Sequence, residues 1–508
     1  MNKKYLMSLA LCCCLSASAC DHAMLDEHPV QEEKALFEIL YAMYLTLPQT
    51  TVSGRVVLCS INKNGNPNVK VTLAGIFETR TVYTDTNGNF SIDNVRTSNY
   101  TISASKQGFQ FIPDSQNITV SSSGLNNINF MTSITWDIKI IGEPDGWISS
   151  YAASQTNDCG YIVVGSSDES SIGDLDFYIV KLDMLGNIMW KQKIDGGEKQ
   201  TDVAYSVLQN PDGTYIAAGS TFSYSKGKSN VMVVKLDVDA KNGQKIWSKT
   251  YGNLDGYWDE ARSISLTSDN GYILTGGSNF SVLKLDANGT QLWTYTSGGG
   301  SADKSMSIQE TPNAANKGYI VCGTTTTETG NHSAMIVKID ADGNVDSNGT
   351  ISWPKLYSNK SNNEGNDIQV TSDGGYIFGG YTGDNFGKAW IVKLDADGNK
   401  TWDQVYGLDT YMNTFNSISK TIEGDYLAAG FTYSFDRNFD DMLIMKIDAS
   451  GNVIWQKTYY TEGDSKNYAN SISQTSDGGI IICGTTTISQ GREAAWILKL
   501  NQEGNIIQ

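Results

Sequence analysis

The sequence predicts an all-β protein in which a small β-sandwich is followed by a seven-bladed β-propeller. The first observation is a short phrase, TSDGGYIFGGYT at residues 371–382, which occurs in related forms seven times after residue 133. The occurrences are spaced by roughly 50 residues, a period typical of solenoids and propellers. The second observation is that each repeat holds four short apolar runs separated by Gly, Asn and Asp, without a long run at helical spacing. Four short strands per repeat indicate propeller blades and exclude helical repeats.

The number of strands predicts how the propeller closes. Third strands of the repeats end in a lysine: Lys181, Lys235, Lys284, Lys338, Lys393, Lys446 and Lys499. Last strands carry a tryptophan: Trp136, Trp190, Trp247, Trp293, Trp353, Trp402 and Trp455. Trp136 precedes the first complete repeat, whereas the last repeat stops without a tryptophan strand. We therefore expect the strand at residues 134–141 to complete the seventh blade, which removes the open sheet edges.

Residues 1–19 have the pattern of a secretory signal peptide: two lysines, an apolar run and small residues before Cys20. The letters ASA before Cys20 suit ordinary signal peptidase, whereas SASAC resembles a bacterial lipobox that makes Cys20 the lipidated first residue. The cysteine directly after the small residues favours lipidation, although Ala17 stands where lipoboxes usually have Leu. Because several acyl chains anchor a protein stably, we expect a lipid-anchored, surface-exposed protein of a bacterial cell envelope, in an outer membrane.

Residues 20–50 are expected to form a tether that contains a short helix. The stretch EEKALFEILYAMYLTL carries apolar residues at helical spacing, and Pro48 ends it. The favoured interpretation is a helix that docks on the protein's own surface. The alternative, a helix in the membrane interface, is less favoured because the stretch lacks basic residues.

Residues 51–132 alternate apolar and polar positions between Asn-Gly turns, which predicts a small β-sandwich. Gly54, Pro67, Val71 and Leu73, with the runs TNGNFSI and YTISASKQGF, resemble the carboxypeptidase-regulatory-like (transthyretin-like) family. This resemblance implies a spacer or interaction module without catalytic residues of its own. Residues 133–508 resemble bacterial and archaeal surface propellers built from DGGYI, KLD, GN and W-x-K-x-Y elements. Some members of that group carry endoglucanase-like or lectin-like labels, but no catalytic motif accompanies them here.

Composition narrows the classes of partner. The formal net charge is −18 at pH 7, which argues against nucleic acid and anionic lipid surfaces. His332 is the only histidine after residue 133, so this region has a single candidate for the histidine that a catalytic triad requires. Four cysteines remain outside the signal peptide, and we expect all of them to be free: Cys59, Cys159, Cys322 and Cys483. We also expect a monomer.

The irregular loops of the predicted propeller hold aromatic residues next to Asp and Asn. The candidates for ligand binding are Trp147, Tyr257, Trp258, Tyr411 and Tyr433. Aromatic rings stack on the C–H faces of neutral sugars, and acidic side chains accept their hydroxyl groups. An equally weighted interpretation is that these rings merely cover neighbouring blades.

Two other patterns concern ions and charges. Asn344, Asp346 and Asn348 partly fit the ligand spacing of a calcium loop, but Lys355 occupies the position where a bidentate Glu is needed. Calcium is therefore a candidate cofactor on a partial motif. The repeated strand lysine is expected to pair with the Asp two residues later, as in Lys181 and Asp183.

The combined prediction is a non-catalytic surface lipoprotein whose propeller binds a glycan or protein ligand, spaced from the membrane by the sandwich. No residue is assigned a catalytic role. The alternatives are a glycoside hydrolase-like enzyme that uses two loop carboxylates, and a structural scaffold of envelope assembly.

Overall fold

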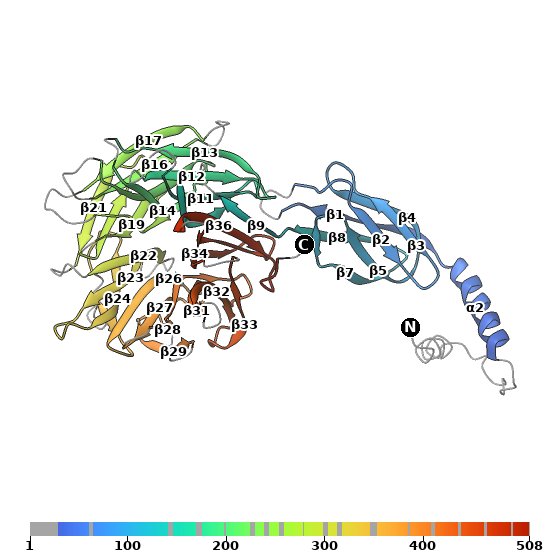
Figure 1. The fold of residues 1–508 in the computed structure, drawn as a ribbon. Helices are drawn as coiled ribbons and strands as arrows, with labels where there is room; N and C mark the ends of the chain where they lie inside the picture. Colours follow the sequence, from blue (N-terminus) through green and yellow to red (C-terminus); the bar gives the residue numbers. More distant parts are fainter. Residues whose placement is uncertain are drawn as a thin grey trace. The chain divides into compact units, whose positions relative to one another are not determined.

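The structure is a computed structural model (Figure 1). It describes residues 29–59, 64–140, 146–168, 175–197, 200–223, 229–237, 243–252, 259–277, 279–297, 303–311, 317–345, 353–384, 387–407, 412–434, 438–461, 465–488 and 491–506. The chain divides into two compact units. Unit 1 comprises Met1–Val56, Pro67–Ala104 and Asp114–Asn129, and unit 2 comprises Val57–Asn66, Ser105–Pro113 and Phe130–Gln508.

Unit 1 contains helix α2 (Pro29–Leu45) and most of the sandwich strands. These strands are β1 (Gln49–Val57), β2 (Lys70–Ala74), β3 (Thr79–Tyr83), β4 (Asn89–Arg96), β5 (Ser98–Ser105), β7 (Ser115–Val120) and β8 (Leu125–Ser133); β6 (Gln110–Ile112) lies in unit 2. They form two four-stranded sheets, in the orders β4-β1-β8-β6 and β3-β2-β5-β7. Alternate side chains such as Val71, Leu73 and Ile102 are fully buried, as the period of two in the sequence predicted.

Helix α2 docks on the strands of unit 1 chiefly through one tyrosine. The hydroxyl groups of Tyr44 and Tyr100 are 2.9 Å apart, and the Tyr44 ring centroid lies 5.0 Å from that of Phe77. The helix ends at Leu45, ahead of Pro48. This docking is the one that the sequence favoured. Among the described residues, no helix is long and apolar enough to cross a membrane.

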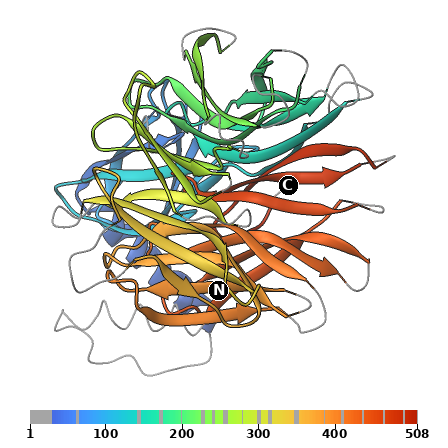
Figure 2. The ribbon, with the colours of Figure 1, turned by 90° about the vertical axis from the view of Figure 1, so that its left-hand side faces the viewer.

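Unit 2 is built from antiparallel four-stranded sheets that follow one another along the chain (Figures 1 and 2). The first three consist of β10 (Trp147–Gln155), β11 (Tyr161–Asp168), β12 (Asp176–Leu182) and β13 (Ile188–Ile194); β14 (Asp202–Gln209), β15 (Tyr215–Thr221), β16 (Asn230–Leu236) and β17 (Lys245–Tyr251); β18 (Ser263–Leu266), β19 (Tyr272–Gly276), β20 (Ser281–Leu285) and β21 (Gln291–Thr296). The next two four-strand groups consist of β22 (Lys304–Thr311), β23 (Gly318–Thr326), β24 (His332–Asp340) and β25 (Lys355–Tyr357); β26 (Asn362–Val370), β27 (Tyr376–Gly383), β28 (Lys388–Leu394) and β29 (Lys400–Tyr406). A single parallel bridge between His332 and Asn362 joins these two groups into one eight-stranded sheet, and each group counts as one of the successive sheets. The last two consist of β30 (Asn413–Lys420), β31 (Tyr426–Ser434), β32 (Phe439–Ile447) and β33 (Val453–Tyr459); β34 (Asn467–Gln474), β35 (Ile480–Thr487), β36 (Glu493–Leu500) and β9 (Trp136–Ile140).

Strand β9, which precedes β10 in the sequence, completes the sheet made by the end of the chain. It pairs antiparallel with β36, with Trp136 opposite Lys499. The Trp136 indole donates a hydrogen bond to the Met184 carbonyl in the last turn of the first sheet, at 3.1 Å. Trp293 makes the same contact with Ala341 of the following sheet. The strand of Trp136 therefore pairs with the end of the chain, as predicted, over Trp136–Ile140.

The predicted pairing of Lys181 with Asp183 is wrong. The Lys181 Nζ atom lies 2.9 Å from Asp158, in the turn between β10 and β11. Gly160 makes room for it, because a Cβ there would lie 2.4 Å from Nζ. Asp183 instead accepts hydrogen bonds from the backbone N–H groups of its own turn. The same pair recurs as Lys235–Asp212, Lys284–Asp269, Lys393–Asp373, Lys446–Asp425 and Lys499–Asp477.

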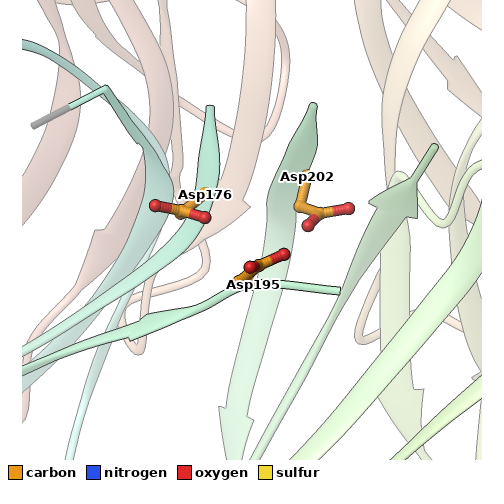
Figure 3. Close-up of side chains that lie close together, drawn as sticks. All are labelled: Asp176, Asp195 and Asp202. Atoms are coloured by element: carbon orange, nitrogen blue, oxygen red, sulfur yellow. The ribbon is translucent and has the colours of Figure 1, made fainter. Parts of the chain in front are cut away.

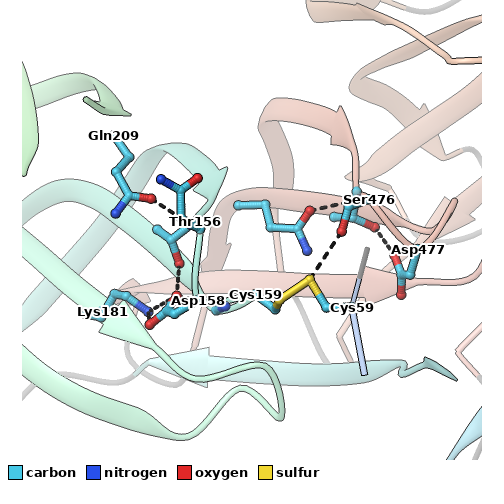
Figure 4. The surroundings of a disulfide bond; sticks show 12 residues. Cys59, Thr156, Asp158, Cys159, Lys181, Gln209, Ser476 and Asp477 are labelled. Carbon is cyan, nitrogen blue, oxygen red and sulfur yellow. Dashed lines mark hydrogen bonds and ion pairs between the residues drawn. A yellow bond between two sulfur atoms is a disulfide. The ribbon is translucent and has the colours of Figure 1, made fainter. Parts of the chain in front are cut away.

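The expectation that all four cysteines are free is also wrong. Cys59 and Cys159 form a disulfide within unit 2, across 100 residues of sequence (Figure 4). Cys59 follows β1 in the segment Val57–Asn66, and Cys159 lies in the turn that carries Asp158. Their spacing in the sequence gave no sign of this proximity, which depends on how the segment packs. Cys322 and Cys483 are free and buried, as predicted.

Candidate functional site

The first strand of the sheets in unit 2 carries a β-bulge that turns one residue out of the ladder. The pairing register shifts around Tyr151, Tyr205, Met306, Asn366, Asn416 and Asn470. In the third sheet, Arg262 occupies the corresponding place, directly before β18. A bulged residue has no partner opposite it, so its side chain is free to point elsewhere.

The repeated glycine in the second strand explains the bulge. A Cβ at Gly165 would lie 1.8 Å from the Ser149 carbonyl oxygen, and one at Gly219 equally close to that of Val203. Only a residue without a side chain allows the two strands to approach this closely. The equivalent glycines in other sheets are equally crowded: Gly323, Gly380, Gly430 and Gly484. The glycine of the phrase GYI-x-x-G therefore positions the bulged residue of the neighbouring strand.

The bulged residues meet in one cavity. Its volume is about 390 Å³, and it draws at least one lining residue from each of the first strands or their starts. The lining consists of Tyr151, Tyr205, Arg262, Met306, Glu364, Asn366, Tyr381, Met412, Thr414, Asn416, Phe431 and Asn470. The volume lies within the range of small-molecule binding sites.

One part of the cavity wall is an arc of asparagines. The Nδ2 atom of Asn366 donates to the Phe415 carbonyl at 3.0 Å. Asn416 and Asn470 repeat the contact toward Ala469 and Ser150, at 2.9 and 2.8 Å. Each amide group therefore links its sheet to the next, and the Asn470 contact links the last sheet to the first. With Nδ2 committed, the Oδ1 atom of each asparagine serves as an acceptor.

The other part of the wall is aromatic and carries one cation. The rings of Tyr151 and Tyr205 meet edge to face, with centroids 5.1 Å apart. The Arg262 guanidinium lies 4.2 Å from the Tyr205 ring centroid, and its Nε donates to Glu260 at 2.7 Å. Burial raises the pKa of Tyr205 to about 12, so its hydroxyl stays neutral at physiological pH. This arc offers ring faces and a cation whose charge is balanced by Glu260.

The cavity lining also includes a carboxylate, on the same strand as Asn366. Glu364 accepts a hydrogen bond from the Tyr381 hydroxyl at 3.2 Å. Burial, with the nearby charge of Glu364, raises the pKa of Tyr381 to about 12. The second oxygen of Glu364 adds a strong acceptor to the cavity. The cavity thus combines ring faces, acceptors and neutral hydroxyl groups.

Of the aromatic residues predicted to bind ligand, the structure describes Trp147 and Tyr433. Trp147 begins β10, four positions before Tyr151, and its side chain is 44% exposed. Tyr433 lies near the end of β31, and its backbone N–H donates to the carbonyl of the cavity residue Met412 at 3.2 Å. Neither side chain lines the cavity. Tyr257, Trp258 and Tyr411 lie outside the described residues, as does the predicted lipidation site Cys20.

The calcium prediction is described only at Asn344. Its backbone N–H donates to Asp340 at 2.8 Å, and its side-chain amide donates to the same carboxylate. Asn187, Asn399 and Asn452 cap their turns in the same way. Asp346 and Asn348 lie outside the described residues, so the calcium loop stays a prediction.

Three carboxylates, those of Asp176, Asp195 and Asp202, lie within 4.8 Å of one another (Figure 3). Asp176 pairs with Lys193 at 2.8 Å, and Asp202 accepts the Gly196 N–H at 2.6 Å. Burial, with the charges of Asp195 and Asp176, raises the pKa of Asp202 to about 6. Other sheets hold an asparagine at the place of Asp202: Asn363, Asn413 and Asn467. Asp202 therefore occupies a polar position that recurs at the start of the first strand in several sheets.

Comparison with solved structures finds weak similarities. Sqt1 from Chaetomium thermophilum is 14% identical, with 70% of this chain and 86% of that one covered at a TM-score of 0.43. A protein of unknown function from Dyadobacter fermentans is 9% identical, with 72% and 99% covered at a TM-score of 0.43. Virginiamycin B lyase from Staphylococcus aureus is 14% identical, with 57% and 83% covered at a TM-score of 0.33. No curated protein sequence matches the chain significantly.

Part of the chain matches a known family model. The model of the carboxypeptidase regulatory-like domain matches residues 51–132. This range is the one that the strand pattern and residues such as Gly54 and Pro67 indicated, and it holds the two four-stranded sheets that include β1 to β8. Residues 51–132 are therefore a carboxypeptidase regulatory-like domain.

Proposed function

We propose that the sheets of unit 2 are the blades of a closed seven-bladed β-propeller, with the cavity on its axis. Successive sheets are hydrogen-bonded in chain order, as when Asn157 N–H donates to Gln209 at 2.7 Å. The equivalent contact joins the last sheet to the first, where Ser476 N–H donates to Gln155 at 2.8 Å. This succession of contacts and the position of β9 support closure.

The chain is a lipid-anchored, non-catalytic binding protein of a bacterial envelope. The signal pattern before Cys20 supports export and lipidation. The Cys59–Cys159 disulfide supports the same location, because such bonds form and persist in oxidising compartments. In chain order, the carboxypeptidase regulatory-like domain lies between the anchor and the propeller, where it serves as a spacer.

The ligand that best fits the cavity is a neutral glycan. The observation that carries this proposal is the cavity wall itself, with tyrosine rings on one arc and amide oxygens on the other. Sugar C–H faces stack on the rings of Tyr151 and Tyr205, while hydroxyl groups donate to the asparagine Oδ1 atoms and Glu364. Anionic glycans are disfavoured because Arg262 is balanced by Glu260 and the whole chain is strongly acidic.

The proposal is tested by screening the full mature protein on a glycan array and measuring affinity for the hits by calorimetry. Tyr205→Ala removes a stacking face worth about 1 to 3 kcal/mol, so binding should weaken roughly 5- to 150-fold. Tyr205→Phe keeps the ring and should bind nearly as well as the wild type. Tyr83→Ala, at an exposed tyrosine of unit 1, is the matched control.

Two results would contradict the proposal. Full-strength glycan binding by Tyr205→Ala, with an unchanged melting curve, would place the ligand outside the cavity. Release of reducing sugars that Glu364→Gln abolishes would establish the hydrolase alternative, because that change removes the carboxylate and keeps the shape of the side chain.

A further inference from the structure

Helix α2 exposes most of its apolar side chains. Leu36, Ile39 and Met43 form a stripe along one face, with Ile39 and Met43 at 58% and 62% exposed. Among the helix side chains that the structure describes, only Tyr44 is buried. A stripe of large apolar residues in water is uncommon on a monomer and marks a surface that something covers.

The neighbouring hairpin adds further apolar side chains beside the helix. Phe77, between β2 and β3, contacts the side of the helix that carries Phe37 and Tyr41, with its ring centroid 5.6 Å from Phe37 and 5.9 Å from Tyr41. Ile76, the residue before it, is 60% exposed. The helix and the tip of the hairpin therefore present apolar side chains from two elements of unit 1.

The position of the helix in the chain identifies the occupant. This step rests on the proposed lipidation of Cys20, which fixes the start of the mature chain to a bilayer. Eight residues lie between Cys20 and Pro29, so even a fully extended connection reaches only about 30 Å. The helix therefore begins close to the membrane surface. It does not cross the bilayer, because it is shorter than a spanning helix and carries charged residues.

We propose that α2 lies in the interface of the lipid bilayer, with Leu36, Ile39, Met43 and Ile76 against the acyl chains. The lack of basic residues, which disfavours this position for a free helix, matters less for an anchored one. The lipid on Cys20 holds the helix at a high effective concentration beside the membrane. The lipids contacted are zwitterionic, since Glu38 and the acidic chain disfavour anionic headgroups. Burial of the stripe in turn orients unit 1 at the membrane.

The test uses the full lipidated protein in vesicles of phosphatidylcholine and phosphatidylethanolamine. The probe is an NBD fluorophore on Ile39→Cys, which is labelled selectively because the native cysteines are disulfide-bonded, buried or, at Cys20, lipidated. Ile422→Cys is the matched control, because Ile422 lies in unit 2 and its side chain is 90% exposed. We expect a blue-shifted emission at residue 39 that lipid-borne nitroxides quench, and an aqueous spectrum at residue 422. The same aqueous spectrum at both positions would overturn the inference.

Further variants separate the helix from the anchor. Ile39→Glu/Met43→Glu should keep palmitate labelling and membrane attachment but return an NBD probe on Ile76→Cys to water. A lipid-buried probe at residue 39 without palmitate labelling would overturn the anchor and leave the helix as the membrane contact. If a second copy covers the stripe, Cys20→Ser protein will sediment as a dimer that Ile39→Glu/Met43→Glu converts to a monomer. That result would also overturn the inference.

Discussion

The turns at one end of the sheets and the bulges in their first strands obey opposite rules. At the turns, one arrangement recurs from sheet to sheet: a buried lysine contacts an aspartate beside a glycine, as in Lys284 and Asp269. At the bulges, the backbone recurs but the side chain changes, from Tyr205 to Arg262 to Asn470. Residues repeated in every sheet therefore build the scaffold, whereas the residue that varies within a fixed backbone shapes the cavity.

The largest effect is expected at β9, the strand that completes the last sheet. Trp136→Ala removes a buried indole from β9 and should lower the free energy of unfolding by about 3 to 5 kcal/mol. Trp353→Ala is the matched control, because Trp353 is similarly buried inside the chain of sheets. Urea denaturation of both variants checks the expectation. A much smaller loss for Trp136→Ala would mean that β9 contributes little to the last sheet.

A comparable effect is expected at the repeated ion pair. Lys499→Met should destabilise by about 3 to 5 kcal/mol, because it leaves the buried carboxylate of Asp477 without its cation. Lys400→Met breaks the half-exposed pair with Asp403 and should cost no more than about 0.5 kcal/mol. Both are measured by urea denaturation. Equal costs for the two variants would show that the repeated lysine is no more than a surface charge.

A pH-dependent gain in stability is expected at Asp202, which stands where other sheets have an asparagine. Since the pKa of Asp202 is raised to about 6, its ionisation costs stability as the pH rises from about 4 to 6. Asp202→Asn should therefore stabilise the protein by up to about 3 kcal/mol at pH 8, at 1.36 kcal/mol per pKa unit, and change little at pH 4. The reverse change, Asn413→Asp, should destabilise at pH 8. Urea denaturation at pH 4 and pH 8 measures the free energy of unfolding of each variant. An equal gain from Asp202→Asn at both pH values would show that the raised pKa of Asp202 does not cause it.

The smallest effect is expected at the rim beside the cavity. Trp147→Ala should weaken the proposed glycan binding by about 1 kcal/mol at most, or roughly fivefold, because its ring is half exposed and lies outside the cavity lining. Its melting curve should not change. Calorimetry measures the loss of affinity in Trp147→Ala and compares it with the loss in Tyr205→Ala. A larger loss from Trp147→Ala than from Tyr205→Ala would move the binding site from the bulges to the loops.

Local patterns in the sequence predicted much of the fold. The repeated four-strand unit, helix α2 and the strand of Trp136 depend on periodicity and on counting, which a single chain displays directly. The cavity was missed because a bulge arises from the close approach of two strands, as between Gly165 and Ser149. One signal was available: the second position of the phrase A-x-S holds Tyr205, Arg262 or Asn470 while its neighbours stay similar. The Cys59–Cys159 bond gave no comparable signal, since it depends on packing between segments 100 residues apart.

The pairing of β9 with β36 also joins a strand that is synthesised early to one that is synthesised last. The chain between Ile140 and Glu493 is roughly 350 residues long, so at about 5 to 20 residues per second β9 waits roughly 20 to 70 seconds for its partner to be made. Throughout that time its backbone is an unpaired edge, ready to join the strands of another nascent chain. We therefore expect the last sheet to form only after β36 has been made, and β9 has to stay unpaired until then.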